Sequence, residues 1–159
     1  MMDANPREDG LMRNGQLGAG SPDPSQVHAN AGTGKPNDHF VEQDGMRFAG
    51  THLIVDLWDA SRLDDLPLVE RTLRQASDAA GATLLRLDLH SFSPTGGITG
   101  VAILAESHIS IHTWPERSYA ALDLFMCGDA KPHEAIAIIK NAFSPGAITL
   151  VEHKRGLVP

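Results

Sequence analysis

The chain has 159 residues, one cysteine and a formal net charge of -7 at neutral pH. One cysteine excludes a disulfide framework and an all-cysteine zinc site. The balance of 20 acidic against 13 basic residues argues against a binder of nucleic-acid phosphates. No apolar run approaches the roughly 18 residues that cross a bilayer, and residues 1–10 lack the apolar core of a secretory signal. We therefore expect a soluble cytoplasmic protein without membrane or nucleic-acid partners.

The beginning of the chain differs in composition from the remainder. The first 50 residues contain eight of the fifteen glycines and four of the ten prolines, and their apolar residues are scattered. Such a segment buries too little surface to offset the entropy lost on ordering. We predict a disordered Gly/Pro/Asn-rich tail over residues 1–45 and one folded domain over residues 46–159.

Strong hydrophobic periodicity begins near residue 51. Residues 53–57 alternate as in a strand. Asp64 or Asp65 can then cap a helix that has Pro67 near its first position, and Gly81 supplies its end. A strand followed by an amphipathic helix therefore opens the domain.

The later elements follow at short intervals. A second strand over residues 83–90 places Leu85, Leu87 and Leu89 on one face. The pattern then predicts three strands, a helix and a last strand, over residues 98–105, 108–113, 119–125, 132–143 and 147–152. Because the links between the central strands are too short for helical crossovers, we predict an α+β fold, a two-layer α/β sandwich with a largely antiparallel sheet and helices on one face.

The predicted sheet leaves one face without helices. Ile109, Ile111, Leu122 and Leu124 suggest that both faces of the central strands are apolar. We therefore predict a homodimer in which the open faces of two sheets pair.

Reactive side chains concentrate on one predicted strand. His108, Ser110 and His112 share a face because side chains alternate along a strand. The two histidines stand roughly 13 Å apart, too far to share an ion, so we expect no metal site. Isolated histidines on a sheet also commonly fill structural roles, as a lone Cys127 or Trp114 can in a core.

A hydrolase is a second interpretation of this region. Ser107, His112 and Asp123 supply the residue types of a catalytic triad. The chain lacks the Gly-x-Ser-x-Gly turn between a strand and a helix that presents a hydrolase serine. Residue types alone therefore support this alternative weakly.

The central segment carries a more specific signal. Residues 106–116, ESHISIHTWPE, and residues 119–128, YAALDLFMCG, closely resemble the bacterial and archaeal S-adenosylmethionine decarboxylase proenzyme family. Flanking segments are similar to that family too, over residues 51–56, 80–83, 91–94, 97–100 and 151–156. The resemblance covers roughly residues 50–156.

This resemblance implies a self-processing, pyruvoyl-dependent decarboxylase. Ser107 would attack the carbonyl of Glu106, and the chain would break between them into a β chain of residues 1–106 and an α chain of residues 107–159. The α chain would begin with a pyruvoyl group derived from Ser107. By the same resemblance His112 is the proton acceptor in processing, which suits an imidazole of near-neutral pKa.

The resemblance also assigns the remaining site residues. Thr99 supplies a hydroxyl that assists processing, and Cys127 is the proton donor in catalysis. Phe92 and Trp114 stack on the purine, and Glu116 holds the ribose. The pyruvoyl group would form a Schiff base with S-adenosylmethionine, which yields S-adenosylmethioninamine and CO2 for spermidine biosynthesis.

One departure from the family and two alternatives accompany this assignment. The chain is one residue longer than the usual family spacing between Pro94 and Thr99, which either loops out or shifts Phe92. Decarboxylation of arginine or ornithine on the same scaffold is one alternative, against which Trp114 and Glu116 argue. An unprocessed binding or regulatory relative is the other. Such a relative should have lost Ser107, His112 or Cys127, and this chain retains all three.

Overall fold

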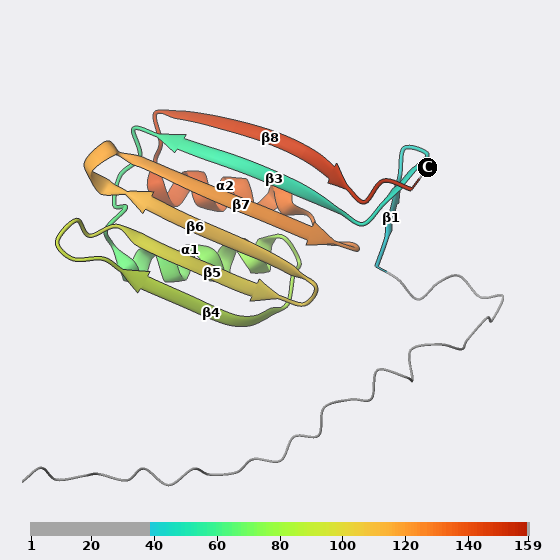
Figure 1. Cartoon of the computed structure of the whole chain (residues 1–159), viewed down its shortest axis with the longest axis horizontal. Coiled ribbons are helices and arrows are strands. Elements are labelled where there is room, and N and C mark those ends of the chain that lie inside the picture. The colour runs from blue at the N-terminus through green and yellow to red at the C-terminus, as the bar shows by residue number, and fades with distance from the viewer. Residues whose placement is uncertain (1–38, 159) are drawn as a thin grey trace, which may run out of the picture. The chain divides into compact units, whose positions relative to one another are not determined.

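The computed structural model describes residues 39–158 (Figure 1). The elements in chain order are β1 (Val41–Gln43), β2 (Met46–Phe48), β3 (Gly50–Trp58), α1 (Leu66–Ala79), β4 (Leu84–Ser91), β5 (Ile98–Leu104), β6 (Ser107–Trp114), the 3₁₀ helix η2 (Pro115–Arg117), β7 (Tyr119–Cys127), α2 (Pro132–Phe143) and β8 (Ala147–Arg155). From β3 onward this order matches the predicted sequence of strands and helices.

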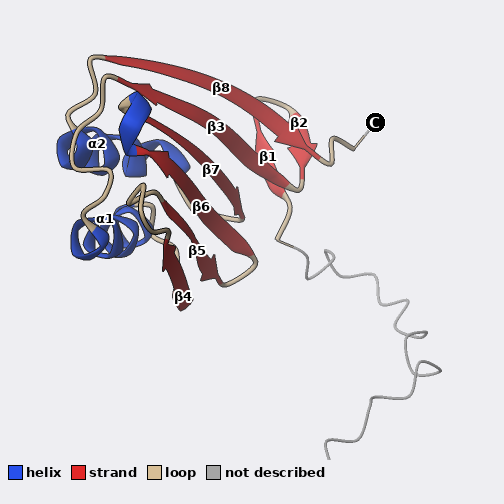
Figure 2. Cartoon of the chain, turned by 60° about the vertical axis from the view of Figure 1, so that its left-hand side comes forward, coloured by secondary structure: helices blue, strands red, loops and turns tan. Residues whose placement is uncertain are grey.

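Six strands form one antiparallel sheet in the order β4-β5-β6-β7-β3-β8. Figure 2 shows α1 and α2 side by side on one face of this sheet, while the other face has no helix. The α+β class, with a largely antiparallel sheet and helices on one face, is therefore confirmed.

Helix α1 begins and ends where local chemistry predicts. The Leu68 N–H donates to Asp65 Oδ1 at 2.9 Å, and Pro67 stands in the first turn. Its buried stripe includes Val69 and Leu73. Gly81, with φ +72°, takes the left-handed conformation that follows many helix C-termini.

The core lies between the helices and the central strands. Ile109, Ile111, Leu122 and Leu124 are all at most 1% exposed, and Ile109 pairs across the strands with Leu124 as Ile111 pairs with Leu122. Directly paired residues share a face, so all four belong to the helix-covered face. The prediction that these four residues make both faces of the sheet apolar is therefore wrong.

The open face has a different composition. Its central residues on β6 and β7 are His108, Ser110, His112, Asp123 and Phe125, none of them fully buried. Exposed large apolar side chains surround this polar centre, from Ile54, Trp58, Ile103, Trp114 and Val151. The open face therefore mixes histidine, carboxylate and apolar groups, unlike an ordinary solvated sheet face.

Strand β4 departs from simple alternation. Its pairing with β5 shifts between Leu84 and Arg86, and this bulge turns Leu85 outward, where it is 63% exposed. Leu87 and Leu89 still pack against the core. The prediction that Leu85 shares their face is wrong because a bulge inserts one residue and reverses the alternation before it.

A short hairpin crosses the predicted domain boundary. β1 pairs antiparallel with β2 through an Asp44-Gly45 turn, in which both residues have positive φ, the geometry that Asp-Gly favours. The described part of the predicted tail, residues 39–45, thus includes a strand, and the remainder of that tail lies outside the described residues. Over residues 39–158 no helix is long and apolar enough to cross a membrane.

The burial difference between two leucines gives a stability prediction. Leu124 is fully buried, whereas Leu85 is 63% exposed. In a Ser107→Ala chain, Leu124→Ala should lower the free energy of unfolding by roughly 2–5 kcal/mol, and Leu85→Ala by no more than about 0.5 kcal/mol. Urea unfolding at fixed protein concentration measures both, and equal losses would contradict this placement of the core.

Candidate active site

Ser107 stands at the start of β6, directly after a tight turn. Leu104 pairs with Ser107 across the β5–β6 hairpin, so only Ala105 and Glu106 form the connection. Glu106 has φ +60°, a left-handed conformation that is uncommon outside glycine. Such conformations cost about 1–3 kcal/mol and cluster at functional sites. The peptide between Glu106 and Ser107 therefore begins from a strained residue.

The end of β7 brings the thiol to this turn. The Cys127 N–H donates to Ser107 Oγ at 3.2 Å. Burial raises the pKa of the Cys127 thiol, and the nearby Glu106 carboxylate raises it further. The thiol therefore keeps its proton at neutral pH and is suited to donate it.

Gly50 makes room for this arrangement. A Cβ at Gly50 would lie 2.5 Å from the Met126 carbonyl oxygen and 3.1 Å from Cys127 Sγ. The first contact is with backbone and cannot be relieved by a side-chain movement. Only glycine lets β3 approach the end of β7 this closely.

A second pair of predicted residues meets further along the sheet. Thr99 on β5 lies directly opposite His112 on β6, with 3.0 Å between Thr99 Oγ1 and His112 Nδ1. The buried Thr113 hydroxyl donates to the Leu63 carbonyl and accepts from the Ile98 N–H. This bridge ties the end of β6 to the start of β5 and sets the register of the pair.

Aromatic side chains extend from this second pair. The Trp114 ring stacks on the Tyr119 ring, with 5.2 Å between the ring centroids. The Trp58 ring also contacts the Tyr119 ring, with 4.4 Å between the centroids. The Tyr119 hydroxyl donates to Asp56 at 2.6 Å, and this hydrogen bond raises the pKa of Tyr119 to about 12. The Tyr119 phenol therefore stays protonated at neutral pH, and its hydroxyl continues to donate to Asp56.

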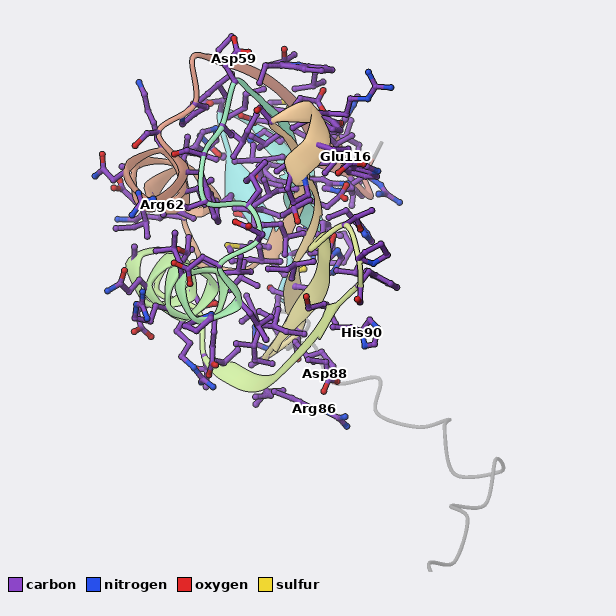
Figure 3. All side chains as sticks on the ribbon, turned by 90° about the vertical axis from the view of Figure 1, so that its left-hand side faces the viewer. Asp59, Arg62, Arg86, Asp88, His90 and Glu116 are labelled. Atoms are coloured by element: carbon purple, nitrogen blue, oxygen red, sulfur yellow. The ribbon has the colours of Figure 1, made fainter. Side chains whose placement is uncertain are left out.

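The two other predicted binding residues lie at the rim of the open face. Phe92 is 48% exposed and meets His90 edge-on at 4.6 Å. Glu116 is exposed on η2, and Figure 3 shows both Glu116 and His90 on the side away from the helices. Before the loop that contains Pro94, His90 pairs with Thr99 on β5.

That loop closes on itself. The Phe92 N–H donates to the Gly97 carbonyl, and the Gly96 N–H donates to the Phe92 carbonyl, both at 2.8 Å. Gly96 has φ +72°, a conformation that glycine adopts without steric cost. A tight glycine turn thus closes the segment that follows Phe92.

The predicted residues form two separate groups. Ser107 and Cys127 meet at one end of β6, and Thr99 and His112 meet at the other. Five residues along a strand span roughly 16 Å. One chain therefore does not bring the proposed nucleophile and its proton acceptor together.

The same geometry bears on the hydrolase alternative. Asp123 accepts from the Ser110 hydroxyl at 3.3 Å and lies 3.4 Å from His52 Nε2, so it serves neither Ser107 nor His112. No Ser107–His112–Asp123 triad forms within the chain.

Sequence reasoning missed a polar cluster at the centre of the open face. His52 Nε2 is buried without a hydrogen-bond partner, although Asp123 stands nearby. The His52 and His108 rings lie 6.5 Å apart, and burial, followed by the charge of His52, lowers the pKa of His108. The alternation of residues in β3 could have placed His52 on the open face. The sequence does not indicate the register of β3 with β7, which brings His52 close to Asp123. Within residues 39–158 no three His, Cys, Asp or Glu side chains converge as metal ligands.

Comparison with known proteins identifies the family. The family model for S-adenosylmethionine decarboxylase matches residues 51–156. The chain belongs to the S-adenosylmethionine decarboxylase family. The S-adenosylmethionine decarboxylase proenzyme of Methanococcus aeolicus is 48% identical over 114 residues, which cover 70% of this chain and 97% of that protein. The proenzyme of Thermomicrobium roseum is 42% identical over 114 residues, covering 71% and 98%.

A solved structure agrees with this assignment. The crystal structure of the adenosylmethionine decarboxylase from Aquifex aeolicus matches with a TM-score of 0.64 and 34% identity, over 70% of this chain and 94% of that one. The predicted resemblance and the predicted enzyme class, a carboxy-lyase, are confirmed. The arginine and ornithine alternatives gain no support from these relatives.

The environment of the single cysteine predicts its reactivity. In a Ser107→Ala chain, iodoacetamide alkylation of Cys127 should rise with pH to a midpoint above the value of about 8.5 for a free thiol. Adding Glu106→Gln should move this midpoint lower but leave it above that of a free thiol, because burial is the larger cause. Adding Glu70→Gln on α1 instead should change nothing, and a midpoint below that of a free thiol would contradict the arrangement.

Proposed function

We propose that this chain is a proenzyme that cleaves itself between Glu106 and Ser107 and then decarboxylates S-adenosylmethionine to S-adenosylmethioninamine and CO2 for spermidine biosynthesis. The observation that carries the proposal is the hydrogen bond from the Cys127 N–H to the Ser107 hydroxyl beside the strained Glu106, whose carboxylate helps to raise the pKa of the Cys127 thiol. Family membership over residues 51–156 supports it independently.

Cleavage needs only water and groups that copies of this chain supply. Ser107 Oγ forms a bond to the Glu106 carbonyl carbon, and the C–N bond breaks while the nitrogen takes the hydroxyl proton, which leaves an ester. Removal of the Ser107 α-proton then expels the Glu106 carboxylate. The β chain of residues 1–106 ends in that carboxylate, and hydrolysis with loss of ammonia leaves a pyruvoyl group at position 107 of the α chain.

The residues around position 107 fit a pyruvoyl group. Such a group supplies a carbonyl that binds the substrate amine and withdraws electrons when CO2 departs. Cys127 is held beside position 107 by its own N–H and keeps its proton because burial and Glu106 raise its pKa. It is therefore placed to return a proton to the substrate carbon.

A second copy completes the site in our proposal. His112 and Thr99 lie roughly 16 Å along β6 from Ser107, so they cannot act on it within one chain. A two-fold dimer that pairs open faces brings the His112 end of one sheet to the Ser107 end of the other. The exposed apolar residues around the open face support this homodimer.

The proposed substrate contacts follow the same division. Trp114, Phe92 and Glu116 lie near the His112 end of the sheet, so each site would take them from the partner copy. Aromatic faces suit the purine and also attract the sulfonium cation of the substrate. The net charge of -7 favours a cationic substrate at long range.

A proton-donating cysteine also bears on location. Oxidation of the chain's one thiol would remove its proton and its function. The cytoplasm keeps thiols reduced, and we therefore propose a cytoplasmic enzyme.

Two substitutions separate cleavage from turnover. Ser107→Ala should abolish both, because nucleophile and pyruvoyl precursor are lost together. Cys127→Ala should still yield the two chains while losing most CO2 release from S-adenosylmethionine, by roughly 10²-fold or more. Intact mass and radiolabelled CO2 release measure the two steps. A wild-type chain that stays full length after prolonged incubation would contradict the proposal, and equal loss of both steps in Cys127→Ala would contradict the proton-donor role.

Complementation tests the shared site. Ser107→Ala and His112→Ala chains should each remain uncut when expressed alone. Co-expressed, they form mixed dimers in which one site combines an intact Ser107 with an intact His112. Only the His112→Ala chain should then be cleaved, as intact mass would show. Cleavage of that chain when expressed alone, or no cleavage in the mixture, would refute a site shared between copies.

A further inference from the structure

A segment upstream of the family region reaches the proposed cleavage bond. His39 Nε2 lies 3.4 Å from Glu106 Oε2, and the Gly128 N–H donates to the His39 carbonyl at 3.0 Å. The family model matches only from residue 51 onward. His39 thus contacts the residue before the bond and the residue after Cys127 from outside the matched region.

The hairpin that follows His39 is anchored to the domain. β1 and β2 pair over three residue pairs. The Val158 N–H donates to the Arg47 carbonyl, and the Ala49 N–H donates to the Arg155 carbonyl, both at 2.8 Å. The Arg47 guanidinium also lies over the Phe40 ring, 5.4 Å from its centroid. The position of His39 is therefore set by backbone hydrogen bonds on both sides of the hairpin.

The charge of Glu106 opposes the first step of cleavage. When Ser107 Oγ bonds to the Glu106 carbonyl carbon, negative charge develops on the carbonyl oxygen of the same residue that carries the carboxylate. Like charges close together raise the energy of that state. An imidazole paired with the carboxylate offsets this repulsion and also restrains the side chain next to the reacting peptide.

We propose that His39 is a positioning residue for self-cleavage, which acts by pairing with the Glu106 carboxylate at the scissile peptide. The inference rests on the proposed cleavage between Glu106 and Ser107. Both side chains are more than half exposed, at 66% and 59%, so water weakens their interaction. The expected effect on the cleavage rate is accordingly modest, roughly two- to fivefold.

The cleavage time course of freshly purified full-length chain, followed by intact mass, tests this role. His39→Ala should slow cleavage roughly two- to fivefold, and His39→Gln should restore most of the rate because its amide donates to the same carboxylate. In a Glu106→Gln chain, His39→Ala should have no further effect. A general structural role would give neither the rescue nor this loss of additivity.

A second exposed pair supplies the matched control. His133 Nε2 lies 3.0 Å from Glu152 Oε2, a pair that does not include Glu106, and His133→Ala should leave the cleavage rate unchanged. If the wild-type chain cleaves and His39→Ala cleaves at the same rate, the His39 role is overturned while the proposed function stands. A slowing that is equal in the Glu106→Gln chain also overturns it. If the wild-type chain is never cleaved, the proposed function itself fails.

Discussion

The extended geometry of β6 is the constraint on which the proposed chemistry depends. A strand advances about 3.3 Å per residue, so Ser107 at its start and His112 near its end are kept apart. Hydrogen bonds to β5 on one side and β7 on the other hold the strand straight. No side-chain rotation closes a gap of this size. We therefore propose that two copies of the chain, rather than one, form the unit in which such a site becomes complete.

The composition of the open face supports the proposed dimer. The helices cover the face that carries Ile109 and Leu124, which leaves His108, Ser110, His112 and Asp123 on the other. Exposed apolar residues frame them, a composition that suits a second copy better than bulk water.

The hairpin end of the sheet shows how backbone geometry prepares a reactive bond. Gly50 admits the end of β7, the Cys127 N–H holds the Ser107 hydroxyl, and the strained Glu106 precedes it. The Glu106 carboxylate has two opposite effects, since it adds to the rise that burial causes in the pKa of the thiol but opposes charge on its own carbonyl. His39 contacts this carboxylate from a segment outside the family match. In our proposal this segment therefore bears on the cleavage chemistry from outside the family match.

The sequence by itself determined the elements from β3 onward, both helix ends and the family, because periodicity, capping residues and the string around Ser107 are local signals. It did not reveal the β4 bulge, which turned Leu85 outward, or the three-residue strands of β1 and β2, which are too short for periodicity. Only the tertiary structure decided which residues meet. Strand register paired Thr99 with His112 and Ser107 with Cys127, put His39 beside Glu106, and separated Ser107 from His112. Register depends on contacts distant in sequence, and no local pattern encodes it.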